Sequence, residues 1–147
     1  LLIGSGTQME IIRSIIIRNG IQNIAIKDKI PRHDYQQLVC ACDIGLISLN
    51  ERFTIPNIPS KTMAYHEAAI PVLASIDSAT DFGQILEQYH LGLWNFAGDI
   101  KTMIENFDRL YSDENLRNEM GLNGRSFLEN NMRIEVAYNT IASKINK

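Results

Sequence analysis

Residues 54–74 read TIPNIPSKTMAYHEAAIPVLA, and this stretch decides the fold class. Its two early prolines fix the backbone φ angle and remove two backbone donors, so the stretch begins as a rigid loop. Ser60 stands where an N-cap residue belongs, which predicts a helix over residues 61–69. Pro71 ends this helix and opens an apolar strand. The unit is therefore a loop, a short helix and a buried strand.

The start of this helix can hold an anion, because free N–H groups and the helix dipole point outward there. Lys61 opposes that dipole, a placement that makes sense where an anion binds at the same end. The alternative, a solvated surface lysine, stays open. We predict phosphate binding at Ser60 and Lys61.

Apolar segments alternate with helical patterns along the rest of the chain. The expected strands are residues 1–3, 24–26, 43–49, 72–75 and 91–94, with three helices after the last one. This alternation predicts an α/β fold, a Rossmann-like parallel sheet with helices on both faces. The strand at 43–49 is nearly all apolar, as a central parallel strand should be. Ligands of such sheets bind outside the carboxyl ends of the strands, where residues 49–61 lie.

Several single residues carry local expectations. Thr7, Ser60, Asp81 and Ser112 are the expected helix starts, Gly121 and Gly124 are expected to break or bend their helix, and Cys40 and Cys42 are expected to be small buried side chains.

Length and composition exclude several classes. A chain of 147 residues with 45% hydrophobic content predicts one globular domain with a real core. The net charge of −3, with scattered basic residues, argues against a nucleic-acid surface. No apolar run is long enough to span a bilayer, and no signal-peptide pattern is present. Residues 1–3 look like the second half of a strand, which predicts a domain truncated on its N-terminal side.

Few residues are arranged for catalysis. The three histidines have no second His or Cys at metal-ligand spacing, and no nucleophile-elbow motif occurs, so neither a metal site nor Ser hydrolysis is expected. Gly4-Ser5-Gly6 forms half of a dinucleotide fingerprint, with Met9 at the third glycine position. A tight turn is the favoured interpretation; direct phosphate contact stays an alternative, and a nicotinamide-binding domain is weakly supported.

Several motifs occur in an order typical of one enzyme family. They are Leu2-Ile3-Gly4-Ser5-Gly6, Asn23-Ile24 through Lys29, Tyr35…Leu38…Ala41-Cys42-Asp43-Ile44-Gly45-Leu46, Pro59-Ser60-Lys61-Thr62…Tyr65…Pro71-Val72 and Asp113…Leu116…Met120-Gly121…Asn123-Gly124-Arg125. Together they resemble the C-terminal domain of retaining family-4 glycosyltransferases of the GT-B architecture. The fourth motif is similar to that of a branch that transfers amino-deoxy sugars such as N-acetyl-fucosamine in bacterial O-antigen or capsule synthesis.

The resemblance implies transfer of a sugar from a nucleotide diphosphate-sugar, UDP-linked, to a glycan or lipid-linked acceptor, without a metal or cofactor. It implies an enzyme of the cytoplasm, either free or peripheral at the inner membrane face. Its donor-binding domain is expected to work with an N-terminal domain of the same chain. No nucleic-acid partner is expected. The implied donor residues are Ile58, Pro59, Ser60 and Lys61 for the diphosphate and sugar, Ile26, Lys27, Asp28 and Ile30 for the base, and Gly4, Ser5 and Gly6 as a turn near the phosphates.

The chain departs from the family pattern at informative positions. Pro56 and Ala64 stand where most members carry two glutamates, so ribose recognition must differ here. Ala69 and Ile70 replace a usual Gly-Lys pair. The Arg and Lys that help stabilise the diphosphate in the family would lie upstream of Leu1, so the fragment alone is predicted to be inactive. A non-catalytic nucleotide-binding or interaction module is the alternative function.

Overall fold

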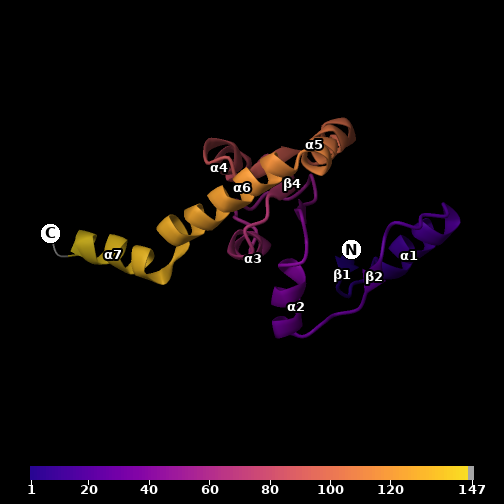
Figure 1. The fold of residues 1–147 in the computed structure, drawn as a ribbon, viewed down its shortest axis with the longest axis horizontal. Coiled ribbons are helices and arrows are strands. Elements are labelled where there is room, and N and C mark those ends of the chain that lie inside the picture. Colours follow the sequence, from indigo (N-terminus) through magenta and orange to yellow (C-terminus); the bar gives the residue numbers. More distant parts are fainter. Residues whose placement is uncertain (146–147) are drawn as a thin grey trace. The chain divides into compact units, whose positions relative to one another are not determined.

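A computed structural model gives the fold and describes residues 1–145. Strands and helices alternate from β1 to β5, and helices alone follow, as the sequence predicts (Figure 1). The elements are β1 (Leu2–Ile3), α1 (Met9–Arg18), β2 (Ile26–Lys27), α2 (Arg32–Val39), β3 (Gly45–Ser48), α3 (Lys61–Glu67), β4 (Val72–Ile76), α4 (Phe82–Gln88), β5 (Gly92–Phe96), α5 (Ile100–Ser112), α6 (Glu114–Phe127), the π-helical η1 (Leu128–Met132) and α7 (Ile134–Ile145). The chain forms two compact units, Leu1–Leu38 and Val39–Lys147.

The first unit is a short parallel pair of strands with a helix between them. β1 pairs with β2 in the register Leu2 to Ile26 and Ile3 to Lys27. The strand predicted at 24–26 therefore starts later, and Ile24 is 38% exposed rather than buried, because β1 offers only two residues for pairing. The predicted cap at Thr7 is also wrong: Gln8 is the N-cap residue of α1 and makes no side-chain capping bond.

The second unit is built on a three-stranded parallel sheet in the order β3-β4-β5. β4 is the central strand of this sheet, and four of its five residues are buried. The prediction that residues 43–49 form a central strand is wrong for this sheet, since β3 pairs with β4 alone among the described strands. Its Leu46 is accordingly 42% exposed.

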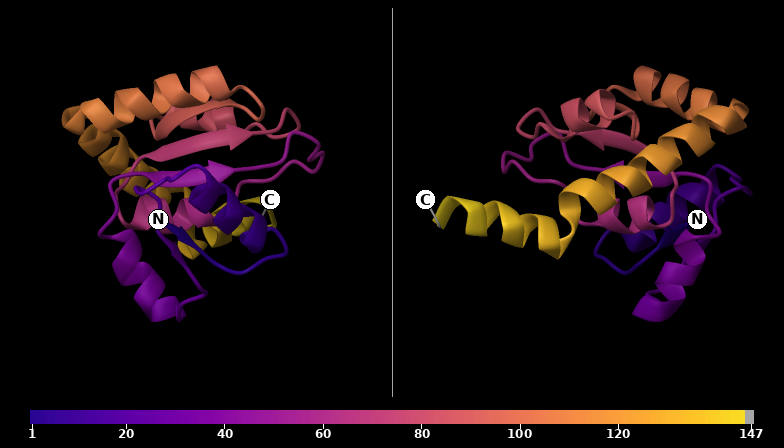
Figure 2. Two further views of the ribbon diagram at one scale, coloured as in Figure 1. Left: turned by 90° about the vertical axis from the view of Figure 1, so that its right-hand side faces the viewer. Right: turned by 60° about the vertical axis from the view of Figure 1, so that its left-hand side comes forward.

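Helices cover both faces of the β3-β4-β5 sheet, which confirms the predicted α/β class. Alternate residues of β4 point to opposite faces. Val72, Ala74 and Ile76 pack in one core cluster with side chains of α4. Leu73 packs on the other face with Leu110 of α5 and Met120 of α6. Figure 2 shows α5 lying along this sheet.

Ser112 and the two cysteines depart from the expectation, whereas Asp81 stands at its expected helix start. Ser112 is the last residue of α5, and Asp113 caps α6 by accepting a hydrogen bond from the backbone N–H of Leu116 at 2.9 Å. Asp81 is the N-cap of α4 but makes no side-chain capping bond. Cys40 is exposed and Cys42 half-buried, because α2 ends before them at Val39.

Helix α6 runs without a break past both of its glycines, contrary to the predicted bend. The glycines serve close packing instead: a Cβ at Gly124 would lie 2.5 Å from Nδ1 of His66, and one at Gly121 would meet the Ala69 carbonyl oxygen. Figure 1 shows the chain turning only after α6 and η1, before α7 begins. None of the helices described within residues 1–145 has the length and apolarity that crossing a membrane requires.

Candidate functional site

A polar pocket of about 440 Å³ lies at the carboxyl ends of the three strands of the second unit. Ser48 ends β3, Ser75 is near the end of β4, and Gly98 follows β5. The carboxyl edge is where parallel α/β sheets bind their ligands. The lining residues are Ser48, Leu49, Asn50, Glu51, Arg52, Ser75, Ala97, Gly98 and Ile100.

Ser75, which lines this pocket, faces a buried asparagine on the neighbouring strand. Ser75 and Asn95 face each other in the β4–β5 register. Asn95 is buried at 4% exposure, and its Nδ2 donates to the Phe96 carbonyl at 2.9 Å and the Asp99 carbonyl at 3.2 Å. The same Nδ2 lies 3.2 Å from Oγ of Ser75. The amide, with two hydrogens, therefore holds the end of β5, and its nitrogen also faces the Ser75 hydroxyl.

Two charged side chains in the pocket are unpaired. Within residues 1–145, neither Glu51 nor Arg52 forms an ion pair or a side-chain hydrogen bond. Only the backbone N–H of Arg52 is engaged, donating to Oδ1 of Asn50 at 2.9 Å. Gly98 adopts a φ of +93°, and Oε2 of Glu51 lies 3.1 Å from the position that a Cβ there would take. Glycine thus leaves the carboxylate room beside the turn.

The predicted diphosphate residues lie together at the start of α3. Ser60 is the N-cap residue as predicted, but its hydroxyl makes no capping bond. Ser60 and Lys61 are both exposed, and α3 is only 7 residues long. None of Ile58, Pro59, Ser60 and Lys61 lines the polar pocket described above.

A threonine pins the loop that leads into α3. Thr80 Oγ1 donates to the Asn57 carbonyl at 2.7 Å and accepts from the Phe82 backbone N–H at 3.1 Å. This side chain ties the proline loop to the start of α4, both at the carboxyl edge. Next to it, Asp77 is 2% exposed and accepts from the Ala79 N–H at 2.9 Å.

The opposite end of α3 is held by α6. Arg125 donates to the Glu67 carbonyl at 2.8 Å and to Oε1 of Glu129 at 2.7 Å. The hydrogen bond from Arg125, aided by the charges of Arg125 and Arg133, holds the pKa of Glu129 below its usual value. Contacts before α3 and at its C-terminal end therefore fix this helix in the second unit.

The predicted base loop and glycine turn belong to the first unit, where they meet. The Gly4 N–H donates to the Lys27 carbonyl at 3.1 Å. Asp28 is engaged by Arg13 of α1 at 3.4 Å, an exposed ion pair. The predicted donor residues are thus divided between the two units.

Sequence reasoning placed residues 49–61 at the ligand-binding edge but named none of the side chains that line the polar pocket as site residues. Ser48, Glu51 and Arg52 come at or directly after the end of β3, and Ser75 is near the end of β4. The rule that ligands bind at the carboxyl ends of parallel strands indicates this edge but does not select individual side chains on it. These residues come from different strands and meet only when the sheet forms, so no local motif marks them.

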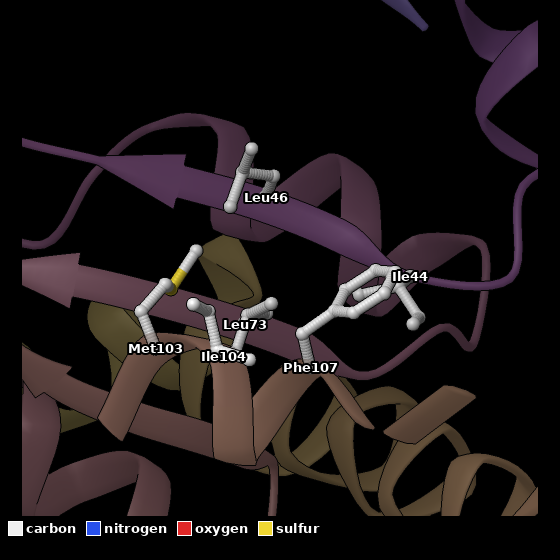
Figure 3. Close-up of a pocket in the computed structure, with 6 residues that line it drawn as sticks. All are labelled: Ile44, Leu46, Leu73, Met103, Ile104 and Phe107. Carbon is white, nitrogen blue, oxygen red and sulfur yellow. The ribbon is translucent and has the colours of Figure 1, made fainter. Parts of the chain in front are cut away.

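A second pocket in this unit, of about 290 Å³, has a different character (Figure 3). Its lining is apolar throughout: Ile44, Leu46, Leu73, Met103, Ile104 and Phe107. Such a lining offers no group for chemistry. Among the described residues, no three His, Cys, Asp or Glu side chains gather as metal ligands.

The fold matches that of a solved enzyme. A crystal structure of WaaG, described as a glycosyltransferase involved in lipopolysaccharide biosynthesis, aligns with 97% of this chain at a TM-score of 0.66. The chain has the fold of a GT-B Rossmann-like domain. The sequence identity is 15%, and the chain spans 36% of the WaaG chain. No protein-family model and no curated protein sequence matches it.

Proposed function

We propose that the chain is the donor-binding domain of a glycosyltransferase that moves a sugar from a nucleotide diphosphate-sugar to a glycan or lipid-linked acceptor in surface polysaccharide synthesis. The observation that carries the proposal is the pinned loop at the carboxyl edge, which leads to Ser60 and Lys61 at the start of α3. The side chains of these two residues donate no hydrogen bond within residues 1–145. The GT-B-type fold supports the proposal.

The chemistry of sugar transfer needs such donors. Negative charge develops on the leaving diphosphate, and donors already aimed at that position stabilise it without reorganisation. In this proposal the Lys61 ammonium and the Ser60 hydroxyl contact the diphosphate, together with backbone N–H groups of Ile58 and Ser60. The base lies against residues 26–30, beside the glycine turn at 4–6.

The finer parts of the proposal follow the family resemblance. They are a retaining mechanism of family 4, a UDP-linked amino-deoxy sugar of the N-acetyl-fucosamine type, and no metal or cofactor. The partner domain is an N-terminal domain of the same chain, and the location is the cytoplasm or the inner membrane face. Because Pro56 and Ala64 replace the family's glutamates, the ribose is held without those carboxylates.

Titration of the chain with uridine diphosphate tests the proposal. Lys61→Ala should weaken binding about tenfold or more, since hydrogen bonds to charged groups contribute roughly 1.5–3 kcal/mol. Ser60→Ala should weaken binding less. Lys144→Ala, which removes an exposed lysine in α7, is the matched control. Binding that is absent at millimolar nucleotide, or that ignores both substitutions, would contradict the proposed site.

The alternative is a non-catalytic nucleotide-binding or interaction module, which the residues Pro56 and Ala64 favour. Sugar transfer measured in the protein that contains this domain separates the two functions. Loss of transfer in Lys61→Ala, with the fold retained, supports the enzyme. Nucleotide binding without any transfer identifies the module.

A further inference from the structure

The hydroxyl of Ser75 is held so that its hydrogen is free to donate. Asn95 must place its amide nitrogen, not its oxygen, toward the carbonyls of Phe96 and Asp99, because only the nitrogen can donate to them. The same nitrogen faces Ser75 Oγ, and an amide nitrogen accepts no hydrogen bond. The Ser75 hydrogen therefore does not point at this nitrogen, and the hydroxyl donates no hydrogen bond within residues 1–145. Ser75 lines the polar pocket.

The other polar groups of the pocket complement this donor. Ser48 adds a second hydroxyl, Arg52 adds unpaired guanidinium donors, and Glu51 adds an unpaired carboxylate that only accepts. The carboxylate argues against a phosphate at this position, since two anions would face each other. Leu49, Ala97 and Ile100 supply an apolar part of the wall. Mixed donors and acceptors beside apolar surface suit a neutral ring that carries several hydroxyls.

We infer that this pocket binds a sugar ring, with the Ser75 hydroxyl, oriented by Asn95, donating to one ring hydroxyl and the Glu51 carboxylate accepting from another. The pocket volume of about 440 Å³ lies within the roughly 300–1,000 Å³ usual for small-molecule sites. The inference rests on the proposed function and extends it, because it assigns the sugar to residues distinct from those proposed for the diphosphate.

The sugar could belong to the donor or to the acceptor, and the probes separate these sources. Amide resonances of the chain are followed by NMR during addition of uridine diphosphate, UDP-glucose, UDP-N-acetylglucosamine and methyl α-glucoside. We expect the sugar-bearing probes to shift the amides of Ser75 and Gly98, and the nucleotide alone to shift that of Lys61. A response to the UDP-sugars alone assigns the donor sugar; a response to methyl α-glucoside as well assigns an acceptor-type saccharide.

Substitutions at Ser75 test the role of the hydroxyl. Ser75→Ala should weaken binding of the sugar-bearing probe roughly 2- to 12-fold, as expected for loss of one hydrogen bond, and leave uridine diphosphate unaffected. Ser75→Thr and Ser75→Val form a pair of equal shape, of which only the threonine keeps the donor. Ser78→Ala, in the exposed loop after β4, is the control.

Three outcomes would overturn the inference. If the sugar-bearing probes leave the amides of Gly98 and Ser75 unshifted while the nucleotide shifts that of Lys61, the proposed function stands and the sugar pocket is refuted. Equal affinity of Ser75→Thr, Ser75→Val and the unmodified chain would remove the hydroxyl from recognition. Absence of binding by every probe would refute the sugar pocket and the proposed function together.

Discussion

Acid should destabilise the second unit through one buried histidine, His66 of α3. Its side chain is 0% exposed, and neither ring nitrogen has a hydrogen-bond partner among the described residues. It lies against Gly124 and Phe127 of α6. The centroids of the His66 and Phe127 rings are 6.1 Å apart. Burial lowers the pKa of His66 from 6.5 to about 4, because the charged imidazolium would lose its hydration.

The sign of the effect follows from proton linkage. Between pH 6.5 and 4 the unfolded chain binds a proton at His66 and the folded chain does not, so stability falls as the pH falls through this window. One pKa unit corresponds to about 1.4 kcal/mol, which makes the folded state about 2 kcal/mol less stable at pH 5 than at pH 7 through this residue. Above pH 6.5 the contribution is flat.

Urea unfolding at pH 7 and pH 5 measures this difference. The only tryptophan, Trp94, lies in β5, so its fluorescence reports on the second unit. His66→Leu should remove about 2 kcal/mol of the pH dependence, whatever its effect on stability at pH 7. His33→Gln, which changes an exposed histidine, should leave the pH dependence in place. The reasoning is refuted if His66→Leu and the unmodified chain lose the same stability between the two pH values.

Two further substitutions test the packing and capping of α6. Gly121→Ala should lower the free energy of unfolding by about 2 kcal/mol, because the new Cβ clashes with the Ala69 carbonyl. The cost of this clash outweighs the roughly 1 kcal/mol gained in helix propensity. In the same urea assay the free energy of unfolding of the exposed control Leu122→Ala should stay within about 0.5 kcal/mol of that of the unmodified chain. Asp113→Ala should cost about 1 kcal/mol by removing the acceptor for the Leu116 N–H, whereas Asp113→Asn should keep most of that stability, and equal losses in the two variants would argue against a capping role.

The resemblance to a glycosyltransferase domain and the fold agree on the class of the second unit. Both place residues 49–61 at the carboxyl edge of a parallel sheet. The assignment of Ser60 and Lys61 to the diphosphate rests on their position at the start of α3 and remains a prediction that the titration decides.

The alternation of strands and helices and the start of α3 were predictable from the sequence. These features depend on local properties: apolar periodicity, the fixed φ of proline, and the side-chain choices at helix ends. The stretch at 54–74 shows this well, since the helix begins after Ser60 and β4 begins after Pro71, as predicted. Exact capping was less predictable, because several neighbouring polar residues could serve.

Which residues meet depends on long-range packing. The edge position of β3 in its sheet depends on which strands pair with it, and the sequence of β3 does not show this. Ser75 and Asn95 come together only because β4 and β5 pair in that register, 20 residues apart in the chain. Gly121 and Gly124, which read as helix breakers, allow α6 to approach α3 closely. The low helix propensity of glycine costs less stability than the close packing of the two helices provides. That packing exists only in the folded chain.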